Sequence, residues 1–183
     1  RVNARVVAPE LLNKVLVKGR MRARLVEVEA YAGDGLDPGS HAHRGPTRRN
    51  RSMFGPPGHL YVYFSYGMHW CANAVCSPPG TATAVLLRAA APLEGLEEMR
   101  AARPAARRDR DLLSGPAKLC GAFGITGLDD GTDLVGGGGL TIVDDGIPPP
   151  DEPATSTRIG LSAGVDLPWR WFVVGEPSVS RLR

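Results

Sequence analysis

The segment LYVYFSYGMHWCAN, Leu60–Asn73, holds three of the four tyrosines in a chain that is only 6% aromatic. Its two halves, Leu60–Tyr66 and His69–Val75, are strand-like and meet near Gly67, which predicts a β-hairpin with aromatic residues near its tip. A buried tyrosine needs space for its ring and a partner for its hydroxyl. The cluster is therefore part of a core or a site for a flat ligand, and these residues alone leave both interpretations open.

Upstream of the hairpin, the segment RARLVEVEAY, Arg22–Tyr31, alternates with the period of a β-strand. The alternation places Val26, Val28 and Ala30 on one face, and Glu27, Glu29 and Tyr31 on the other. Acidic residues are common on the open face of an edge strand. On these residues alone, solvation is the simpler interpretation of Glu29.

Helices and strands are predicted along the rest of the chain. The strands are TATAVLLRA, ending at Arg88, and later LTIVDD and WRWFVVG. Helices are predicted in APELLNKVLVKG with Pro9 at its start, in PLEGLEEMRAARPAARR up to Pro104 at most, and in SGPAKLCGAFGI with Ser114 as N-cap and Gly124 as stop. No repeat or sharp break divides the chain, so residues 1–183 are expected to form one domain.

The composition is that of a globular protein, with 43% hydrophobic and 22% charged residues. No apolar run approaches the roughly 20 residues of a membrane span, and no charged-then-apolar leader opens the chain. Cys71, Cys76 and Cys120 cannot all pair within one chain, which favours a reducing compartment. A soluble intracellular protein is therefore expected.

A block of arginines precedes the aromatic segment, within the irregular stretch Ala32–Gly58. It consists of Arg44, Arg48, Arg49 and Arg51, with no acidic residue among them. The net charge of +3 permits a polyanionic partner without requiring one. A solvated loop is the simple interpretation, but the aromatic residues that follow favour contact with nucleic acid.

Several common kinds of catalytic site have no motif in this sequence. The sequence has no zinc-binding pattern of the paired C-x-x-C, H-E-x-x-H or deaminase type. His41 and His43 are the one pair with the spacing of metal ligands. The G-x-S-x-G of serine hydrolases and the phosphate loops of nucleotide-binding proteins are also missing. These patterns therefore argue against a metal site, with His41 and His43 the one pair left to consider.

The remaining features fit an enzyme that acts on a base in DNA. Such an enzyme extracts the base from the stack and holds it between flat side chains. A hairpin tip can fill the gap left in the duplex, and arginines can grip the phosphates. A carboxylate can then activate water to attack the sugar carbon. Each of these parts has a candidate within about seventy residues.

The sequence resembles the alkyladenine (3-methyladenine) DNA glycosylases of the mammalian type, a family also found in bacteria. The likeness is carried by VEVEAYAG, DPGSHAHRGPTRRNRSMFGPPGHLYVYFSYGMHWCANAV, AVLLRAAAPLEG and LLSGPAKLCGAFGI, in the family's order. It is densest between Arg24 and Ile125, and weak between Leu128 and Thr157. The resemblance implies a single mixed α/β (α+β) domain around a curved antiparallel sheet, with a protruding hairpin, surrounding helices and no cofactor.

The resemblance also implies a role for each matching residue. Glu29 would activate the water, which Arg88 and the backbone carbonyl of Ile159 help to place. Tyr31, His41 and Tyr63 would be walls of the base pocket, and Asn73 would read the purine edge. Tyr66 would enter the minor groove in place of the flipped nucleotide, and the arginines of the block would hold phosphates.

The leading hypothesis is a monofunctional glycosylase of base excision repair. It would hydrolyse the bond between an alkylated or deaminated purine and deoxyribose in double-stranded DNA, as a monomer in the bacterial cytoplasm near the nucleoid. The alternative is a non-catalytic protein that binds lesions or the minor groove. His43 stands where relatives more often carry an aromatic or small residue, and the sequence does not rank the candidate lesions.

Overall fold

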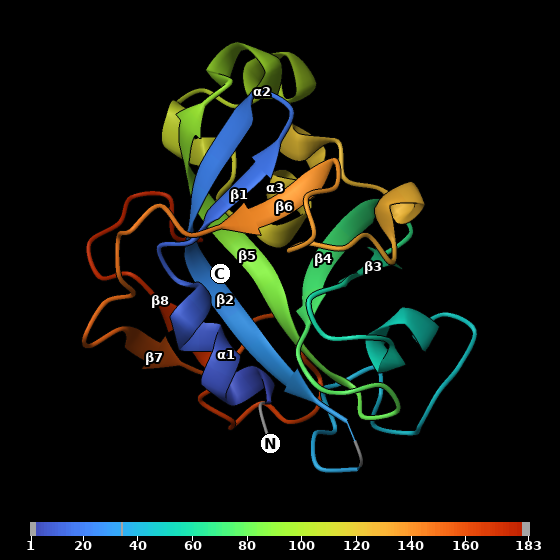
Figure 1. The fold of residues 1–183 in the computed structure, drawn as a ribbon. Helices are drawn as coiled ribbons and strands as arrows, with labels where there is room; N and C mark the ends of the chain where they lie inside the picture. Colours follow the sequence, from blue (N-terminus) through green and yellow to red (C-terminus); the bar gives the residue numbers. More distant parts are fainter. Residues whose placement is uncertain (1–2, 34, 181–183) are drawn as a thin grey trace.

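The computed structural model describes residues 3–33 and 35–180 and consists of one curled, fully antiparallel sheet with helices packed around it (Figure 1). The strand order is β3-β4-β5-β2-β1-β6, while β8 pairs with β2 and β7 pairs with β8. The strands are β1 Val15–Lys18, β2 Met21–Ala32, β3 Leu60–Ser65, β4 His69–Val75, β5 Thr83–Glu94, β6 Leu140–Val143, β7 Ala154–Ser156 and β8 Arg170–Phe172. The helices are α1 Ala4–Leu11, α2 Leu96–Ala102 and α3 Pro116–Phe123. The predicted fold class is confirmed.

The strand β2 lies in the interior of the sheet, between β5 and β1, and is covered on both faces. Helix α1 packs on the face that carries Val28 and Ala30, together with Trp169 and Trp171. The opposite face carries Glu27 and Glu29, which are fully buried. The expectation of an open edge strand is therefore wrong. β8 pairs along the edge of β2, and Arg170, Ser180 and the loop at Ile159 cover a face that alternation alone marks as polar.

A β-bulge interrupts the pairing of β2 with the long strand β5. Glu27 is opposite Ala89, whereas the next residue of β2, Val28, is opposite Leu87. Arg88 is therefore the extra residue of the bulge. Bulges re-aim side chains and are common next to active sites. The strand does not end at Arg88, as predicted, but continues to Glu94 because β2 pairs with it along its whole length.

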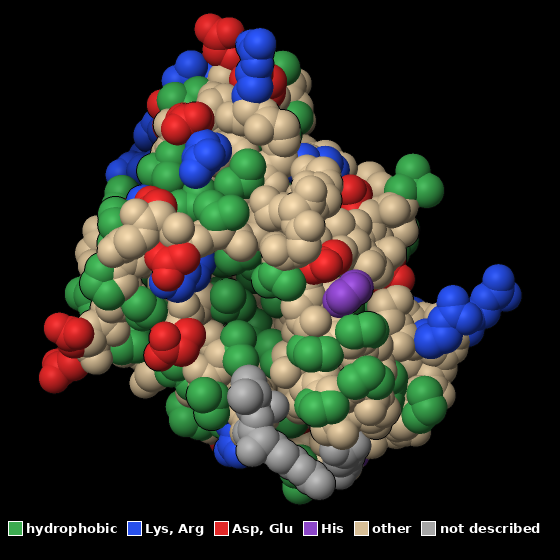
Figure 2. All heavy atoms as spheres, in the orientation of Figure 1, with side chains coloured by type: hydrophobic (Ala, Val, Ile, Leu, Met, Phe, Trp, Pro, Cys, Tyr) green, Lys and Arg blue, Asp and Glu red, His purple; other side chains and the backbone are tan. Residues whose placement is uncertain are grey.

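The main apolar core lies where α2 and α3 pack against β5 and the hairpin. It includes Leu60, Ala72, Leu87, Met99 and Phe123. On the other side, α1 borders an apolar groove lined in part by Val7, Leu11, Val75 and Ile142. Figure 2 shows hydrophobic side chains around a hollow on that face. Within residues 3–33 and 35–180, no helix has the length and apolarity needed to cross a membrane.

Two predicted helix starts are wrong. Helix α1 begins at Ala4, where the side chain of Asn3 accepts a hydrogen bond from Arg5 N, and Pro9 lies inside it. Proline has no N–H to continue the ladder, and the chain turns at Asn13 with a φ of 66° into β1. Helix α3 has Gly115, not Ser114, at its N-cap and Pro116 at its first position, while Gly124 ends it as predicted.

The hairpin of β3 and β4 is confirmed and positions the aromatic residues. Tyr61 is opposite Asn73, and Tyr63 is opposite Cys71. Met68 N donates to Ser65 O at 3.2 Å to close the turn. Tyr66 has a φ of 51° and Gly67 a φ of 66°, the positive angles that a type I′ hairpin turn requires. An aromatic residue rarely adopts this conformation.

Candidate active site

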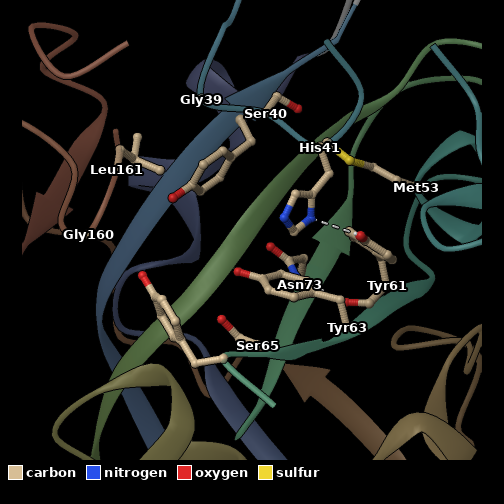
Figure 3. Close-up of a pocket in the computed structure, with 12 residues that line it drawn as sticks. Gly39, Ser40, His41, Met53, Tyr61, Tyr63, Ser65, Asn73, Gly160 and Leu161 are labelled. Atoms are coloured by element: carbon tan, nitrogen blue, oxygen red, sulfur yellow. Dashed lines mark hydrogen bonds between the residues drawn. The ribbon is translucent and has the colours of Figure 1, made fainter. Parts of the chain in front are cut away.

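A pocket of about 130 Å³ opens between the hairpin, the end of β2 and two loops (Figure 3). A single water needs roughly 10–15 Å³ of such space, so the pocket has room for a ring. Its lining includes Tyr31, His41, Tyr63, Tyr66, Asn73 and Leu161. Five of the residues predicted to contact substrate or DNA thus meet at one cavity, although they come from four separate parts of the chain.

Three aromatic rings form one wall of the pocket. His41 packs edge-on against Tyr63 with ring centroids 4.5 Å apart, and Tyr63 lies 5.6 Å from Tyr61. The Tyr61 hydroxyl is hydrogen-bonded to His41 Nδ1 at 3.1 Å, the dashed line in Figure 3. Burial, and then the positive charge of Arg49, lower the pKa of His41. Tyr61 is buried, and its hydroxyl orients His41, a contact that the sequence pattern does not indicate.

Asn73 lies on β4 at the back of the same pocket and is buried. Its Nδ2 donates to the backbone oxygen of Tyr61 at 3.1 Å. This bond crosses the hairpin between paired residues and fixes the orientation of the amide. The amide therefore presents a defined pattern of hydrogen-bonding groups to the cavity.

Glu29 lies next to Tyr31 and is held by three groups. The Tyr31 hydroxyl donates to Oε2 at 2.8 Å, and Ile159 N donates to Oε1 at 2.7 Å. Arg88 Nη1 lies 3.2 Å from Oε1. Burial raises the pKa of Glu29 above its ordinary value, because the loss of water outweighs the charge of Arg88 and both hydrogen bonds.

Tyr31 connects the carboxylate to the pocket. Its ring lines the cavity, and its hydroxyl contacts Glu29. Burial, and then the negative charge of Glu29, raise the pKa of Tyr31 well above its ordinary value. The hydroxyl therefore remains a hydrogen-bond donor at neutral pH.

The loop that carries Ile159 is held by a buried ion pair that the sequence did not indicate. The guanidinium of Arg158 makes two bonds to Asp37, of 2.6 and 2.7 Å. It also donates to the backbone oxygens of Ala30 and Gly164 and lies 4.6 Å from the centre of the Tyr31 ring. Asp37 lies in an irregular segment, so spacing gave no sign of this pairing.

Ile159 contacts Glu29 through its backbone N–H, which donates to Oε1. The role that the resemblance implies for its backbone carbonyl, in placing the water, stays a prediction. Ile159 therefore orients the carboxylate directly. Leu161, two residues later in the same loop, contributes to the pocket.

The arginine block lies on an exposed loop that follows His41. Arg49 reaches β3, where Nη2 donates to the backbone oxygen of Phe64 at 2.8 Å. Its guanidinium also lies 5.7 Å from the centre of the Tyr63 ring. Asn50 is buried and ties the loop together, since its Nδ2 donates to the backbone oxygens of His41 and Gly45.

Among residues 3–33 and 35–180, no group of three or more His, Cys, Asp or Glu side chains could hold a metal ion. His41 is instead bonded to Tyr61. The Nδ1 atom of His43 is buried and has no hydrogen-bond partner within the described residues. The side chains that line the pocket are aromatic, hydroxyl, amide and apolar groups.

A family model described as Methylpurine-DNA glycosylase (MPG) matches residues 1–177. The chain belongs to the methylpurine-DNA glycosylase family. It is 61% identical over 176 residues to a protein of Burkholderia lata. The alignment covers 95% of this chain and 84% of that protein.

Two further relatives support the same family. A protein of Leifsonia xyli subsp. xyli is 53% identical over 188 residues, covering 95% of this chain and 85% of that protein. A protein of Streptomyces avermitilis is 49% identical over 184 residues, and the alignment covers 97% of this chain and 86% of that protein. The names of all three relatives assign them to the 3-methyladenine DNA glycosylases. The predicted family and enzyme class, a DNA glycosylase of DNA repair, are thereby confirmed.

In this methylpurine-DNA glycosylase the hairpin tip is apolar and projects from the pocket. Tyr66 is 81% exposed and Met68 is 67% exposed. Phe64 is 43% exposed and packs against Trp70 across the hairpin, with the two rings tilted and their centroids 4.7 Å apart. The tip therefore presents rings to solvent from a rigid base.

Proposed function

We propose that this methylpurine-DNA glycosylase removes an alkylated or deaminated purine from double-stranded DNA and leaves an abasic site. The candidate bases are 3-methyladenine, 7-methylguanine, hypoxanthine and etheno-adenine. The damaged base is flipped into the pocket, where Tyr31, His41 and Tyr63 flank it. The neutral His41 ring and the fixed amide of Asn73 offer hydrogen-bonding groups to its edge.

Glu29 acts as the general base of the proposed reaction. It takes a proton from water as the oxygen bonds to the sugar C1′, while the bond to the purine nitrogen breaks and the base leaves with the bonding electrons. A carboxylate is most effective when its pKa lies near the working pH, and burial moves Glu29 in that direction. The charge of Arg88 opposes that rise and favours the carboxylate form, and Ile159 N donates to Oε1. This buried carboxylate beside an aromatic pocket is the observation that carries the proposal.

The exposed groups around the pocket account for DNA binding in this proposal. Tyr66 enters the duplex through the minor groove and takes the place of the flipped nucleotide. Arg44, Arg48, Arg49 and Arg51 contact phosphates. The chain works as one glycosylase domain and as a monomer, in the bacterial cytoplasm at the nucleoid.

The decisive experiment uses duplexes that each carry one of the four lesions. Wild-type protein should convert at least one of them to an abasic site, detected by strand cleavage after alkali treatment. Glu29→Gln should bind the same duplex and release no base, and Glu98→Gln, at an exposed position on α2, should behave as wild type. A non-catalytic lesion-binding protein would instead give salt-dependent binding with no abasic product.

A further inference from the structure

Glu27 is a second buried carboxylate, two residues before Glu29 on the same face of β2. Its Oε1 accepts bonds from Arg88 Nε at 2.8 Å and Arg170 Nε at 2.7 Å. Ser180 donates to it through both its backbone N–H and its hydroxyl, each at 2.7 Å. Glu27 is fully buried, so these groups replace its water shell.

Arg88 bridges the two carboxylates. Its Nε bonds to Glu27, while its Nη1 lies 3.2 Å from Oε1 of Glu29. The bulge in β5 gives Arg88 a position between the two acidic side chains. A guanidinium is planar and rigid, so holding Nε at Glu27 also determines where Nη1 points.

The surroundings of Glu27 and Glu29 shift the pKa values of the two carboxyl groups in opposite directions. Burial favours the neutral form of Glu27, but the charges of Arg88 and Arg170, with bonds from Arg170 and Ser180, outweigh it and lower its pKa. The pKa of Glu29 is raised by burial, and the negative charge of Glu27 adds to that rise. Glu27 is thus the permanent anion of the pair.

We propose that Glu27 is a positioning residue of the glycosylase: it fixes the guanidinium of Arg88 so that Nη1 reaches Glu29, with Arg170 balancing its charge. This inference rests on the proposed function, in which Glu29 is the general base. A buried ion cluster is seldom the most stable way to fill a core. The arrangement of this ion cluster around Arg88 is explained if the cluster keeps Glu29 oriented while the pKa of Glu29 stays raised.

The test compares Glu27→Gln, which keeps the shape and loses the charge, with Glu27→Asp, which keeps the charge. Single-turnover base release is measured against pH, beside binding of the lesion duplex. Glu27→Gln should lower the rate about 10- to 100-fold, because the geometry at Glu29 is loosened. Binding should change by less than about 2-fold, since Glu27 does not line the pocket.

The pH profile separates positioning from a purely structural role. The charged and titratable groups that face Glu29 are Glu27 and Tyr31 on β2, Arg88 on β5, and Tyr63 and Cys71 on the hairpin. The negative charge of Glu27 raises the pKa of Glu29, so its loss should move the acid side of the pH–rate profile (the acid limb) to lower pH. In Glu27→Asp the limb should stay at the wild-type pH, with a rate between those of wild type and Glu27→Gln.

Each result has one meaning. If the wild type releases no base, the proposed function fails before Glu27 is considered. If the wild type is active, and folded Glu27→Gln retains its rate and acid limb, the positioning role is wrong. Should Glu27→Gln not fold, Ser180→Ala removes one hydroxyl bond to Glu27, and it should lower the rate about 3- to 10-fold with binding intact. An unchanged rate in Ser180→Ala would then overturn the inference.

Discussion

The Tyr31 hydroxyl donates a hydrogen bond of 2.8 Å to Oε2 of Glu29, so one residue is both a wall of the pocket and a ligand of the carboxylate. In the proposed function, base recognition and water activation therefore share a side chain. A ring that moves to accommodate a base also moves the donor that holds Glu29. This coupling leads to the first prediction.

Tyr31→Phe should keep the wall and lose the donor. A hydrogen bond to the ionised form lowers a carboxyl pKa, so its loss should raise the pKa of Glu29 further and move the acid limb of base release to higher pH. The rate at neutral pH should fall about 10-fold. Tyr61→Phe is the matched control, because its hydroxyl bonds His41 and not Glu29. An acid limb that does not move in Tyr31→Phe would contradict the assignment.

Tyr66→Gly should separate stability from function. Tyr66 has a φ of 51°, a conformation that costs a non-glycine residue about 1–2 kcal/mol. Its side chain is exposed, so replacing it should raise the free energy of unfolding by up to about 1 kcal/mol in urea. Base release should fall, because nothing fills the gap in the duplex. Gly67→Ala, at the neighbouring position, should instead lower the free energy of unfolding. If Tyr66→Gly and wild type are equally stable, the backbone at Tyr66 is not strained.

Asp37→Ala should cost about 3–5 kcal/mol, because it leaves the Arg158 guanidinium buried without its carboxylate. The loss should appear as a lower urea midpoint. The control is Asp144→Ala, which breaks the exposed pair with Lys14 and should cost at most about 1 kcal/mol. Similar losses in the two variants would mean that the Asp37 pair does not hold the loop.

The His41 ring should titrate below its ordinary pKa of 6.5, because burial and the charge of Arg49 both disfavour the imidazolium. Its NMR titration midpoint should therefore lie below 6.5, and the ring should be neutral at pH 7. Arg49→Gln removes one of the two causes and should raise the midpoint. A lower or unchanged midpoint in that variant would exclude Arg49 as a cause.

Arg48→Ala and Arg51→Ala should each weaken binding to any duplex, with or without a lesion. Each loss of a phosphate contact should reduce the slope of log affinity against log salt by about 1. Arg20→Ala, at an exposed position in the turn between β1 and β2, should leave the slope unchanged. If the slope is unchanged in all three variants, Arg48 and Arg51 do not contact the phosphates of the DNA.

The hairpin and β2 could be predicted because their patterns are local. Alternation over Leu60–Val75 gave both strands and the turn, and alternation over Arg22–Tyr31 gave the shared face of Glu27 and Glu29. Alternation does not say whether a face is covered, and that cover comes from β8 and the loop at Ile159, more than a hundred residues later. For the same reason the strand pattern alone favours a solvated Glu29, whereas the structure buries it.

The contacts that the sequence could not indicate join distant and irregular segments. Arg158 and Asp37 are 121 positions apart, and neither lies in a helix or strand. Pro9 was placed at a helix start by its general preference, whereas Asn3 provided the actual cap. Local preference is a weak guide where a single hydrogen bond fixes the boundary.

The bond from Ile159 N to Glu29, and those from Ser180 to Glu27, have a consequence for synthesis on the ribosome. A nascent chain that has emerged only as far as β6 can pair the strands of the hairpin with β5 and β2. It cannot yet complete the contacts of either acidic side chain, because Ile159, Arg170 and Ser180 have not been made. The contacts around the two carboxylates are therefore completed only after Ser180 has been made, and a chain that terminates between β6 and Ile159 should be inactive and a substrate for degradation.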